Sequence, residues 1–308
     1  MRAAAILAVL ALTAAAPARG ETVHEALDAY ALYQSDVSAL LDAEIGDAAA
    51  IDAALERAAR HDPARVSRGW IAYGALTAAQ SPAFAAGVRS RVRAAGRAPV
   101  IRQLRRDLSY ARRRPPGSAE AIGLILTAVR ADSARIGAAG RRFEAIGEAL
   151  ETGAWTASAE RGAREARLRM TGAARLPPEA LERLHIGPLA ASPLTDANAL
   201  GGRRFWDALA GRESEMQNLD PPRERRGHAA TTDRMLTLAG LIIVGADASE
   251  AARVNAVLDE PRTRDCLALE QLQFRQCASV AHDPSEDALC LARHGLSAPG
   301  ACFSAMLQ

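Results

Sequence analysis

The sequence contains no lysine, and all 38 of its basic side chains are arginines. Schiff-base enzymes, P-loop proteins and Ser-x-x-Lys hydrolases each require a lysine ammonium group, so the composition excludes these three classes. The motifs His-Glu-x-x-His, Gly-x-Ser-x-Gly, Gly-x-Gly-x-x-Gly and Cys-x-x-Cys-His are missing as well. We therefore expect no cofactor and no metal site, and no enzyme class is indicated by a motif.

Aromatic residues are scarce, at 4% of the chain, whereas alanine is abundant. Sandwich and barrel cores are rich in β-branched and aromatic side chains, and alanine favours closely packed helices. The composition therefore predicts an all-α protein, a multi-helix bundle or array. Composition shifts predict four parts, which are a signal peptide (1–18), an N-terminal helical domain (19–175), a Pro/Gly-rich linker or lid with short helices (176–231), and a C-terminal helical unit (232–308).

Long apolar runs are also missing, because no stretch reaches the roughly 20 residues that span a bilayer as a helix. The chain begins with Arg2, an apolar stretch over Ala3–Ala15, and an Ala-x-Ala site at Ala16–Ala18. This pattern is typical of a signal peptide that is cleaved after Ala18, and an uncleaved membrane anchor is the alternative. The apolar run Met235–Ala246 is short enough to be a buried helix. We expect a soluble protein that is periplasmic or secreted and is not transmembrane after cleavage.

Helix starts are marked by capping residues and prolines. Thr22 and Glu25 have the spacing of a capping box. The pairs Asp62–Pro63 and Ser81–Pro82 each place an N-cap residue before a proline at the first helical position. A further helix is expected to start at Pro99. These signals predict several short helices in the first hundred residues.

The longest predicted helix runs from about Ser118 to Thr152. Apolar residues recur there every seven positions, with a second row three residues further on, which predicts one buried seam. The first row consists of Ile122, Val129, Ile136, Phe143 and Leu150. Helices are expected to resume at Thr232 and to run to about Leu258, with a bend near Gly245.

Cysteine is absent from the first 265 residues, and all four cysteines lie between Asp265 and Phe303. Cysteines of an exported protein are expected to pair. The segment up to Val280 is predicted to be one helix. On it, Cys266 and Cys277 lie about 16 Å apart at 1.5 Å per residue, whereas the Cα atoms of a disulfide lie within about 7 Å. These two cysteines therefore cannot pair with each other.

A helical hairpin resolves the pairing. A turn at residues 282–285 starts a second helix, which we expect to reach His294 and to end at Gly295. This hairpin places Cys277 opposite Cys290 and returns the chain towards the start of the first helix. The predicted disulfides are Cys277–Cys290 and Cys266–Cys302. A metal site that combines cysteines with His282 and His294 is the alternative, but the close cysteine pairs of zinc modules are missing.

Charge is unevenly distributed along the chain. Residues 89–114 contain ten arginines and one acid, Asp107, whereas residues 21–62 contain ten acids and two arginines. The ten arginines are Arg89, Arg91, Arg93, Arg97, Arg102, Arg105, Arg106, Arg112, Arg113 and Arg114. Such a surface suits an anionic lipid, lipopolysaccharide or peptidoglycan. The alternative is internal pairing with the acidic first helices. Nucleic acid is not expected, since only Tyr110 lies among the arginines as a stacking residue.

A short segment suggests a second kind of function. Gly211-Arg212-Glu213-Ser214 resembles the Glu-Ser segment of lytic transglycosylases, exported helical enzymes whose glutamic acid acts as acid and base on peptidoglycan. This resemblance implies a catalytic role for Glu213 in a peptidoglycan hydrolase. It covers about seven residues, and the Gly-Leu-Met-Gln segment expected further on is absent. A solvated acidic helix end is the simpler interpretation.

Three segments resemble a set of uncharacterised secreted helical proteins of GC-rich proteobacteria. They are "GWIAYGALTAAQSPAFAAGVR", "CLALEQLQFRQC" and "EDALC". The resemblance implies export and a cysteine-linked C-terminal end, and it transfers no catalytic residue. We therefore expect a non-enzymatic helical scaffold or binding protein of the cell envelope, with the Arg-rich segment as its contact surface.

Overall fold

The computed structural model describes residues 21–151, 168–169, 206 and 222–308, and every structural statement below concerns these residues. The protein is all-α, as its composition predicts, and Glu224 and Leu307 form an isolated antiparallel bridge. The first helices are α1 (Val23–Asp42), α2 (Ala48–Ala59), α3 (Pro63–Ala79), α4 (Pro82–Ala95), α5 (Arg97–Arg106), α6 (Tyr110–Arg113) and α7 (Ser118–Glu151). The later ones are α12 (Ala229–Ile243), α13 (Ala251–Leu258), α14 (Pro261–Val280), α15 (Pro284–Cys290), the π-helix η1 (Leu291–Ser297) and α16 (Ala298–Ser304).

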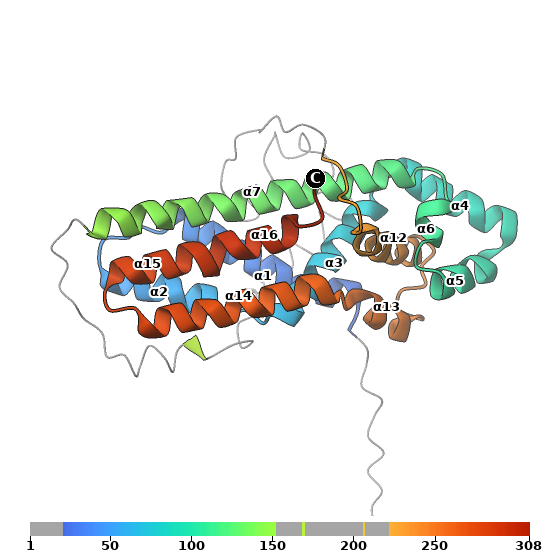
Figure 1. Ribbon diagram of the computed structural model, residues 1–308. Coiled ribbons are helices and arrows are strands. Elements are labelled where there is room, and N and C mark those ends of the chain that lie inside the picture. Colours follow the sequence, from blue (N-terminus) through green and yellow to red (C-terminus); the bar gives the residue numbers. More distant parts are fainter. Residues whose placement is uncertain (1–20, 152–167, 170–205, 207–221) are drawn as a thin grey trace, which may run out of the picture.

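The helices are arranged along one long axis (Figure 1). The 34-residue helix α7 runs along one side for much of the length, and α15, η1 and α16 pack directly against it. Helix α14 runs along the opposite side and packs against α3 and η1. Helices α4, α5 and α6 form one end of the molecule, beyond α12 and α13.

Helix α3 lies at the centre of the core, where it packs against α1, α7, α12 and α14. Its Gly69 allows α1 to approach closely, because a Cβ at this position would lie 2.6 Å from the carbonyl oxygen of Ala26. The core joins the two ends of the sequence, since Tyr30 of α1 meets Phe303 of α16 edge to face at 5.6 Å between ring centroids. The domain boundaries predicted from the sequence remain predictions.

Three predicted helix starts are confirmed by their caps. The hydroxyl of Thr22 accepts a hydrogen bond from the amide of Glu25 at 3.1 Å, and the Glu25 carboxylate accepts one from the Thr22 amide at 2.7 Å. Asp62 caps α3 by accepting from the amide of Arg65 at 2.8 Å. Ser81 caps α4. Short-range hydrogen bonds of this kind can be read from the sequence because both partners lie within one turn.

The start predicted at Pro99 is wrong by two residues. Helix α5 begins at Arg97, directly after Gly96, whose φ of 86° breaks the chain between α4 and α5. A left-handed φ favours glycine, which has no Cβ. The glycine therefore determines where α5 begins, and Pro99 lies inside its first turn, where its missing N–H has no consequence.

The long helix predicted for residues 118–152 is observed as α7. The seam faces the core: Val129, Ile136 and Phe143 of the first row are buried, while Ile122 and Leu150 near the two ends are half-buried. A seven-residue spacing thus identified the buried side of the helix correctly.

Two other helix limits differ from the prediction. The helical stretch expected from Thr232 to Leu258 consists of α12 and α13, and at Gly245, where a bend was expected, a φ of 62° ends α12. The stop expected at Gly295 does not occur, since the chain continues through η1 into α16. In η1, Gly295 lies close to the side chain of Leu291, where a Cβ would come within 2.8 Å, so this glycine serves packing.

Both predicted disulfides are present. The Cα atoms of Cys266 and Cys302 are 5.8 Å apart, and those of Cys277 and Cys290 are 5.6 Å apart. The first bond joins the start of α14 to α16, and the second joins the end of α14 to the end of α15. The C-terminal helices are therefore covalently held at both ends of α14. Paired cysteines are compatible with an oxidising compartment.

None of the helices in the described ranges combines the length and the apolar character that a membrane crossing requires.

Candidate functional site

The helices α4 and α5 form a hairpin at one end of the molecule (Figure 1). Residues 82–106 contain seven of the ten arginines identified in the sequence and no acidic residue. The inner side of the hairpin is apolar, with Phe84, Val88, Val100 and Leu104 buried. We call residues 82–106 the basic tip. Its apolar side fixes it to the body of the protein and directs the arginines outwards.

Two arginines anchor the basic tip to neighbouring segments. Arg97 donates to the carbonyl oxygens of Val244 at 3.0 Å and of Gly245 at 2.8 Å. These carbonyls lie at the C-terminal end of α12, where a cation also compensates the helix dipole. Arg105 forms an ion pair with Glu250, in which its Nε lies 2.8 Å from Oε2. These arginines hold the fold together and are not available for a ligand.

The arginines that follow the basic tip are also paired in part. Arg112 contacts two acids, with Nη1 2.9 Å from Glu224 and Nε 2.5 Å from Asp233. Burial raises the pKa of Asp233, and the attraction of Arg112 only partly opposes this. Arg113 lies 2.6 Å from Asp107. The contacts of Arg112 join α6 to α12 and to the segment before α12, and the contact of Arg113 joins α6 to the segment before α6.

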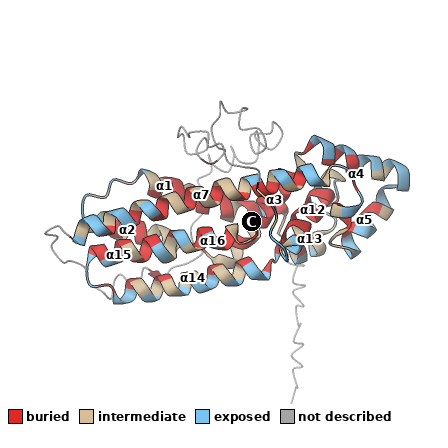
Figure 2. Ribbon diagram, turned by 45° about the horizontal axis from the view of Figure 1, so that its top comes forward, coloured by how far each residue is buried: buried red, intermediate tan, exposed pale blue. Residues whose placement is uncertain are grey.

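The side chains of five of the ten arginines are exposed and have neither an ion-pair nor a hydrogen-bond partner among the described residues. They are Arg89, Arg93, Arg102, Arg106 and Arg114. Arg89 and Arg93 are four residues apart on α4, as are Arg102 and Arg106 on α5, so each pair shares one helix face. Figure 2 shows the outer sides of α4 and α5 exposed. Like charges gathered without an acid give this end of the molecule a positive potential.

The acidic residues of the first helices have local partners instead. Asp36 of α1, which is buried, contacts Arg57 at 2.9 Å, Arg60 at 2.5 Å and the Nε2 atom of His61 at 2.8 Å. Burial alone would raise the pKa of Asp36, but the contacts with His61 and Arg60 outweigh it, and the pKa is lowered. Asp36 thus finds its charged partners within residues 21–62 and not among the arginines of residues 89–114.

A buried polar network joins α1 to α7. Asp132 accepts hydrogen bonds from the hydroxyl of Tyr30 at 2.9 Å and from the indole Nε1 of Trp206 at 3.1 Å. Gln34 donates to the Tyr30 hydroxyl at 2.8 Å and accepts from Arg135 at 2.6 Å. Burial, followed by the charge of Asp132, raises the pKa of Tyr30. The network satisfies buried polar groups and is closed to solvent, so its role is structural.

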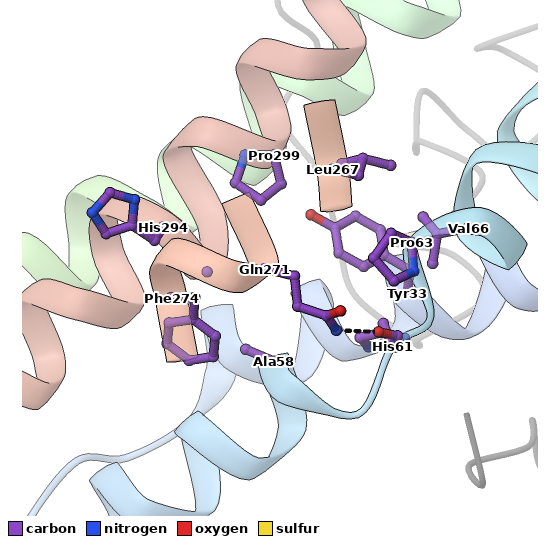
Figure 3. Close-up of a pocket in the computed structure, with 11 residues that line it drawn as sticks. Tyr33, Ala58, His61, Pro63, Val66, Leu267, Gln271, Phe274, His294 and Pro299 are labelled. Atoms are coloured by element: carbon purple, nitrogen blue, oxygen red, sulfur yellow. Dashed lines mark hydrogen bonds between the residues drawn. The ribbon is translucent and has the colours of Figure 1, made fainter. Parts of the chain in front are cut away.

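A small pocket lies between the start of α3, helix α14 and η1 (Figure 3). Its lining is mostly apolar and includes Tyr33, His61, Phe274 and His294. Its volume is about 40 Å³. The hydroxyl of Tyr33 is buried there and forms no hydrogen bond with another described residue, and burial raises its pKa. A cavity that binds benzene measures roughly 150 Å³, so this pocket suits water and not a metabolite.

The remaining sequence predictions have mixed outcomes. Glu213, the residue implied by the transglycosylase resemblance, lies outside the described residues. In the part of the chain that is described, no group of three or more His, Cys, Asp and Glu side chains could hold a metal ion. His294 lies 3.2 Å from Glu270, and exposed His282 lies 3.4 Å from Glu286. The cysteines of the alternative metal site are in disulfides.

Sequence reasoning missed the burial of Asp36. Asp36 belongs to a segment of ten acids, and nothing in its neighbours distinguishes it from exposed ones. Its partners Arg57 and Arg60 are more than twenty residues away. The one available signal was the apolar spacing of α1, on which Asp36 lies next to Val37, a buried position.

Comparisons with known proteins give no relative, because no family model, no curated protein and no solved structure matches the chain.

Proposed function

We propose that the protein is an exported, non-enzymatic helical protein of the cell envelope whose basic tip binds an anionic lipid surface. The observation that carries the proposal is the group of four exposed arginines on α4 and α5 whose side chains have neither an ion-pair nor a hydrogen-bond partner among the described residues. They are Arg89, Arg93, Arg102 and Arg106. The phosphate groups of lipid headgroups would supply the missing charge.

Arginine is well suited to this role, because its planar guanidinium group can donate two hydrogen bonds to one phosphate. The residues at the turn between α4 and α5 are small and exposed: Ala94, Ala95, Gly96 and Ala98. Apart from Arg97, which is bonded to Val244 and Gly245, the turn has no bulky side chain, so the flanking arginines can approach a flat surface. We prefer a membrane to a polymer strand as the ligand, because the arginines lie on the exposed outer sides of two helices at one end of the molecule.

The two disulfides support the export part of the proposal, because such bonds persist in oxidising compartments such as the bacterial periplasm. The signal-peptide pattern at residues 1–18 agrees with this. The disulfides also make the C-terminal helices rigid, which suits a scaffold that presents a surface.

Sedimentation with lipid vesicles tests the proposal. The oxidised protein is mixed with vesicles of phosphatidylcholine alone or with about 30% phosphatidylglycerol, and the bound fraction is measured between about 0.05 and about 0.5 M NaCl. We expect binding to the anionic vesicles only, and its loss as salt screens the charges. Equal binding to both vesicles, or none at low salt, would contradict the proposal. Binding to lipopolysaccharide but not to the vesicles would move the ligand from lipid to that polymer.

A further inference from the structure

The exposed large apolar side chains of the described residues all lie on one helix. They are Leu269, Leu272 and Val280 of α14, with exposed fractions of 52%, 53% and 68%. In Figure 2 the outer side of α14 is exposed along most of its length. Exposed leucines are ordinary when they are scattered, but a row of them on one helix face marks a contact surface.

The spacing along α14 is that of a coiled-coil seam. Exposed positions alternate four and three residues apart, from Asp265 through Leu269, Leu272 and Gln276 to Ser279. A mean spacing of 3.5 residues keeps these positions on one side of a helix that pairs with another helix. Between Leu269 and Val280 the exposed residues of α14 carry no charge. We call the positions 262, 265, 269, 272, 276 and 279 the α14 stripe, and exposed Val280 lies beside its last position.

We propose that the α14 stripe is the contact with a second copy of this chain, in which two α14 helices pair antiparallel about a twofold axis. Each leucine then packs against the other leucine of its partner, Leu269 against Leu272 and Leu272 against Leu269, because antiparallel seams join unlike heptad positions. A twofold contact uses the same patch on both copies, which a single self-complementary helix face provides.

The charges at the ends of the stripe favour the antiparallel arrangement. Arg262 is exposed at the start of α14, and Asp283 is exposed directly after its end. The contact of Asp283 with Ser285 lowers its pKa, so it is ionised at neutral pH. Antiparallel pairing brings Arg262 to the other copy's helix C-terminus and Asp283, whereas parallel pairing would oppose Arg262 to Arg262 and Asp265 to Asp265.

The register is consistent with these partners. When residue 269 lies opposite residue 272, residue 265 lies opposite residue 276, so the Asp265 carboxylate can accept a hydrogen bond from the Gln276 amide. Arg262, whose Nη1 donates to the carbonyl oxygen of Gly227 at 2.6 Å, then lies opposite residue 279 in the last turn of the other copy's α14. Every exposed polar group of the stripe thus has a partner, and the leucines form its dry centre.

A single helix pair buries a small interface, so we expect a weak dimer that forms at micromolar concentration. Sedimentation equilibrium of the oxidised, full-length protein over roughly 1 to 200 µM measures it. The variant Leu269→Glu/Leu272→Glu should raise the dissociation constant at least about 100-fold, because it places four carboxylates in the contact. The matched control Thr127→Glu/Ala145→Glu changes two exposed positions of α7 and should leave it unchanged. Circular dichroism checks that both variants fold.

A mixing experiment tests the antiparallel register itself. Leu269→Arg and Leu272→Glu are prepared as separate proteins, and one carries a heavy-isotope label. In the antiparallel pair the new arginine of one copy faces the new glutamate of the other, so native mass spectrometry should find mixed dimers well above the statistical half of all dimers. Parallel pairing would also enrich mixed dimers, because it opposes arginine to arginine or glutamate to glutamate in the unmixed ones. The double variant Leu269→Arg/Leu272→Glu separates the two arrangements: antiparallel pairing sets each arginine against a glutamate and keeps the dimer, whereas parallel pairing sets like charges against each other and abolishes it.

Three results would overturn the proposal. The first is a wild-type protein that stays monomeric at about 200 µM, the upper end for a weak contact of this size. The second is a Leu269→Glu/Leu272→Glu variant that dimerises as well as the α7 control. The third is a wild-type protein that forms no dimer, together with a Leu269→Glu/Leu272→Glu variant that no longer binds vesicles. This result would assign the α14 stripe to a lipid surface.

Discussion

At the scale of single residues, Asp36 is a buried acid whose contribution to stability follows from its neighbours. Its side chain is buried between α1 and the end of α2, yet three basic groups surround it. A buried carboxylate is costly unless it is paired and hydrogen-bonded. Arg57 and Arg60 are partly exposed, so each can return to water if the carboxylate is lost. Removing Asp36 should therefore cost less than breaking a fully buried ion pair.

The lowered pKa of Asp36 predicts a pH-dependent stability. A carboxyl whose pKa is lower in the folded than in the unfolded state stabilises the fold above the unfolded pKa of about 3.9 and loses this effect as the pH falls through the folded pKa. We expect Asp36→Asn to lower the free energy of unfolding by about 2 kcal/mol at pH 7, because charged hydrogen bonds are lost. Below pH 4 the difference from the wild type should shrink.

Urea unfolding followed by circular dichroism at several pH values measures this difference. Glu144→Gln on the exposed side of α7 is the control and should have no effect at any of them. The contradicting result is a difference in the free energy of unfolding between Asp36→Asn and the wild type that is as large in acid as at neutral pH. This result would show that lost packing, and not lost charge, destabilises the variant.

At the scale of helices, the contact between α1 and α3 depends on Gly69. Any side chain there would meet the backbone of α1, at 2.6 Å from the Ala26 carbonyl oxygen and 2.7 Å from the Tyr30 amide. Backbone atoms cannot move aside as a flexible side chain can. The sequence marks Gly69 only as one glycine among 23, because the close approach involves a helix about forty residues away.

Gly69→Ala should therefore destabilise the protein by about 1 to 3 kcal/mol through overpacking. Gly123→Ala on α7 is the natural counterpart, because a Cβ there meets nothing within 4 Å. It should stabilise the protein by about 0.5 to 1 kcal/mol, since alanine favours a helix more than glycine does. Thermal unfolding of the wild type and both variants measures the two changes in stability, which should be opposite in sign. The same change in stability for both variants would refute the close approach of α1 and α3.

The disulfides belong to the same scale, because each closes a loop between helices. Cys266–Cys302 spans 36 residues and Cys277–Cys290 spans 13. Since the longer loop restricts the unfolded chain more, replacing the first pair by serine should cost about 4 kcal/mol and replacing the second about 3 kcal/mol. Urea unfolding of the two double-serine variants measures the order, and a reversed order would mean that folded-state contacts outweigh loop entropy.

How far the sequence predicts these elements depends on the range of the interaction. The cap at Thr22, the seam of α7 and both disulfides were predicted, because each follows from neighbours or from simple helix geometry. The break at Gly245 and the continuation through Gly295 were not, since a glycine can end a helix or allow close packing. Only the tertiary surroundings decide between these roles.

At the scale of the whole molecule, the sequence predicts where charged residues lie along the chain but not which of them pair in the fold. The sequence locates ten arginines in one segment but cannot say which of them are paired. In the fold, Arg97 and Arg105 bond to the segment after α12, whereas the arginines on the outer faces of α4 and α5 remain exposed. The protein therefore has one end with a net positive surface. The long axis of the molecule separates this end from α15 and α2 (Figure 1).

The measurement that tests this account most directly compares two variants that each lose four positive charges. The first is Arg89→Gln/Arg93→Gln/Arg102→Gln/Arg106→Gln, and the control is Arg141→Gln/Arg225→Gln/Arg226→Gln/Arg293→Gln, which changes exposed arginines elsewhere. Each arginine near an anionic membrane contributes about 1 kcal/mol, so we expect the first variant to bind anionic vesicles about 100- to 1,000-fold more weakly than the wild type. The control should bind almost as the wild type does. Equal losses in both variants would show that overall charge, and not the basic tip, brings the protein to the membrane.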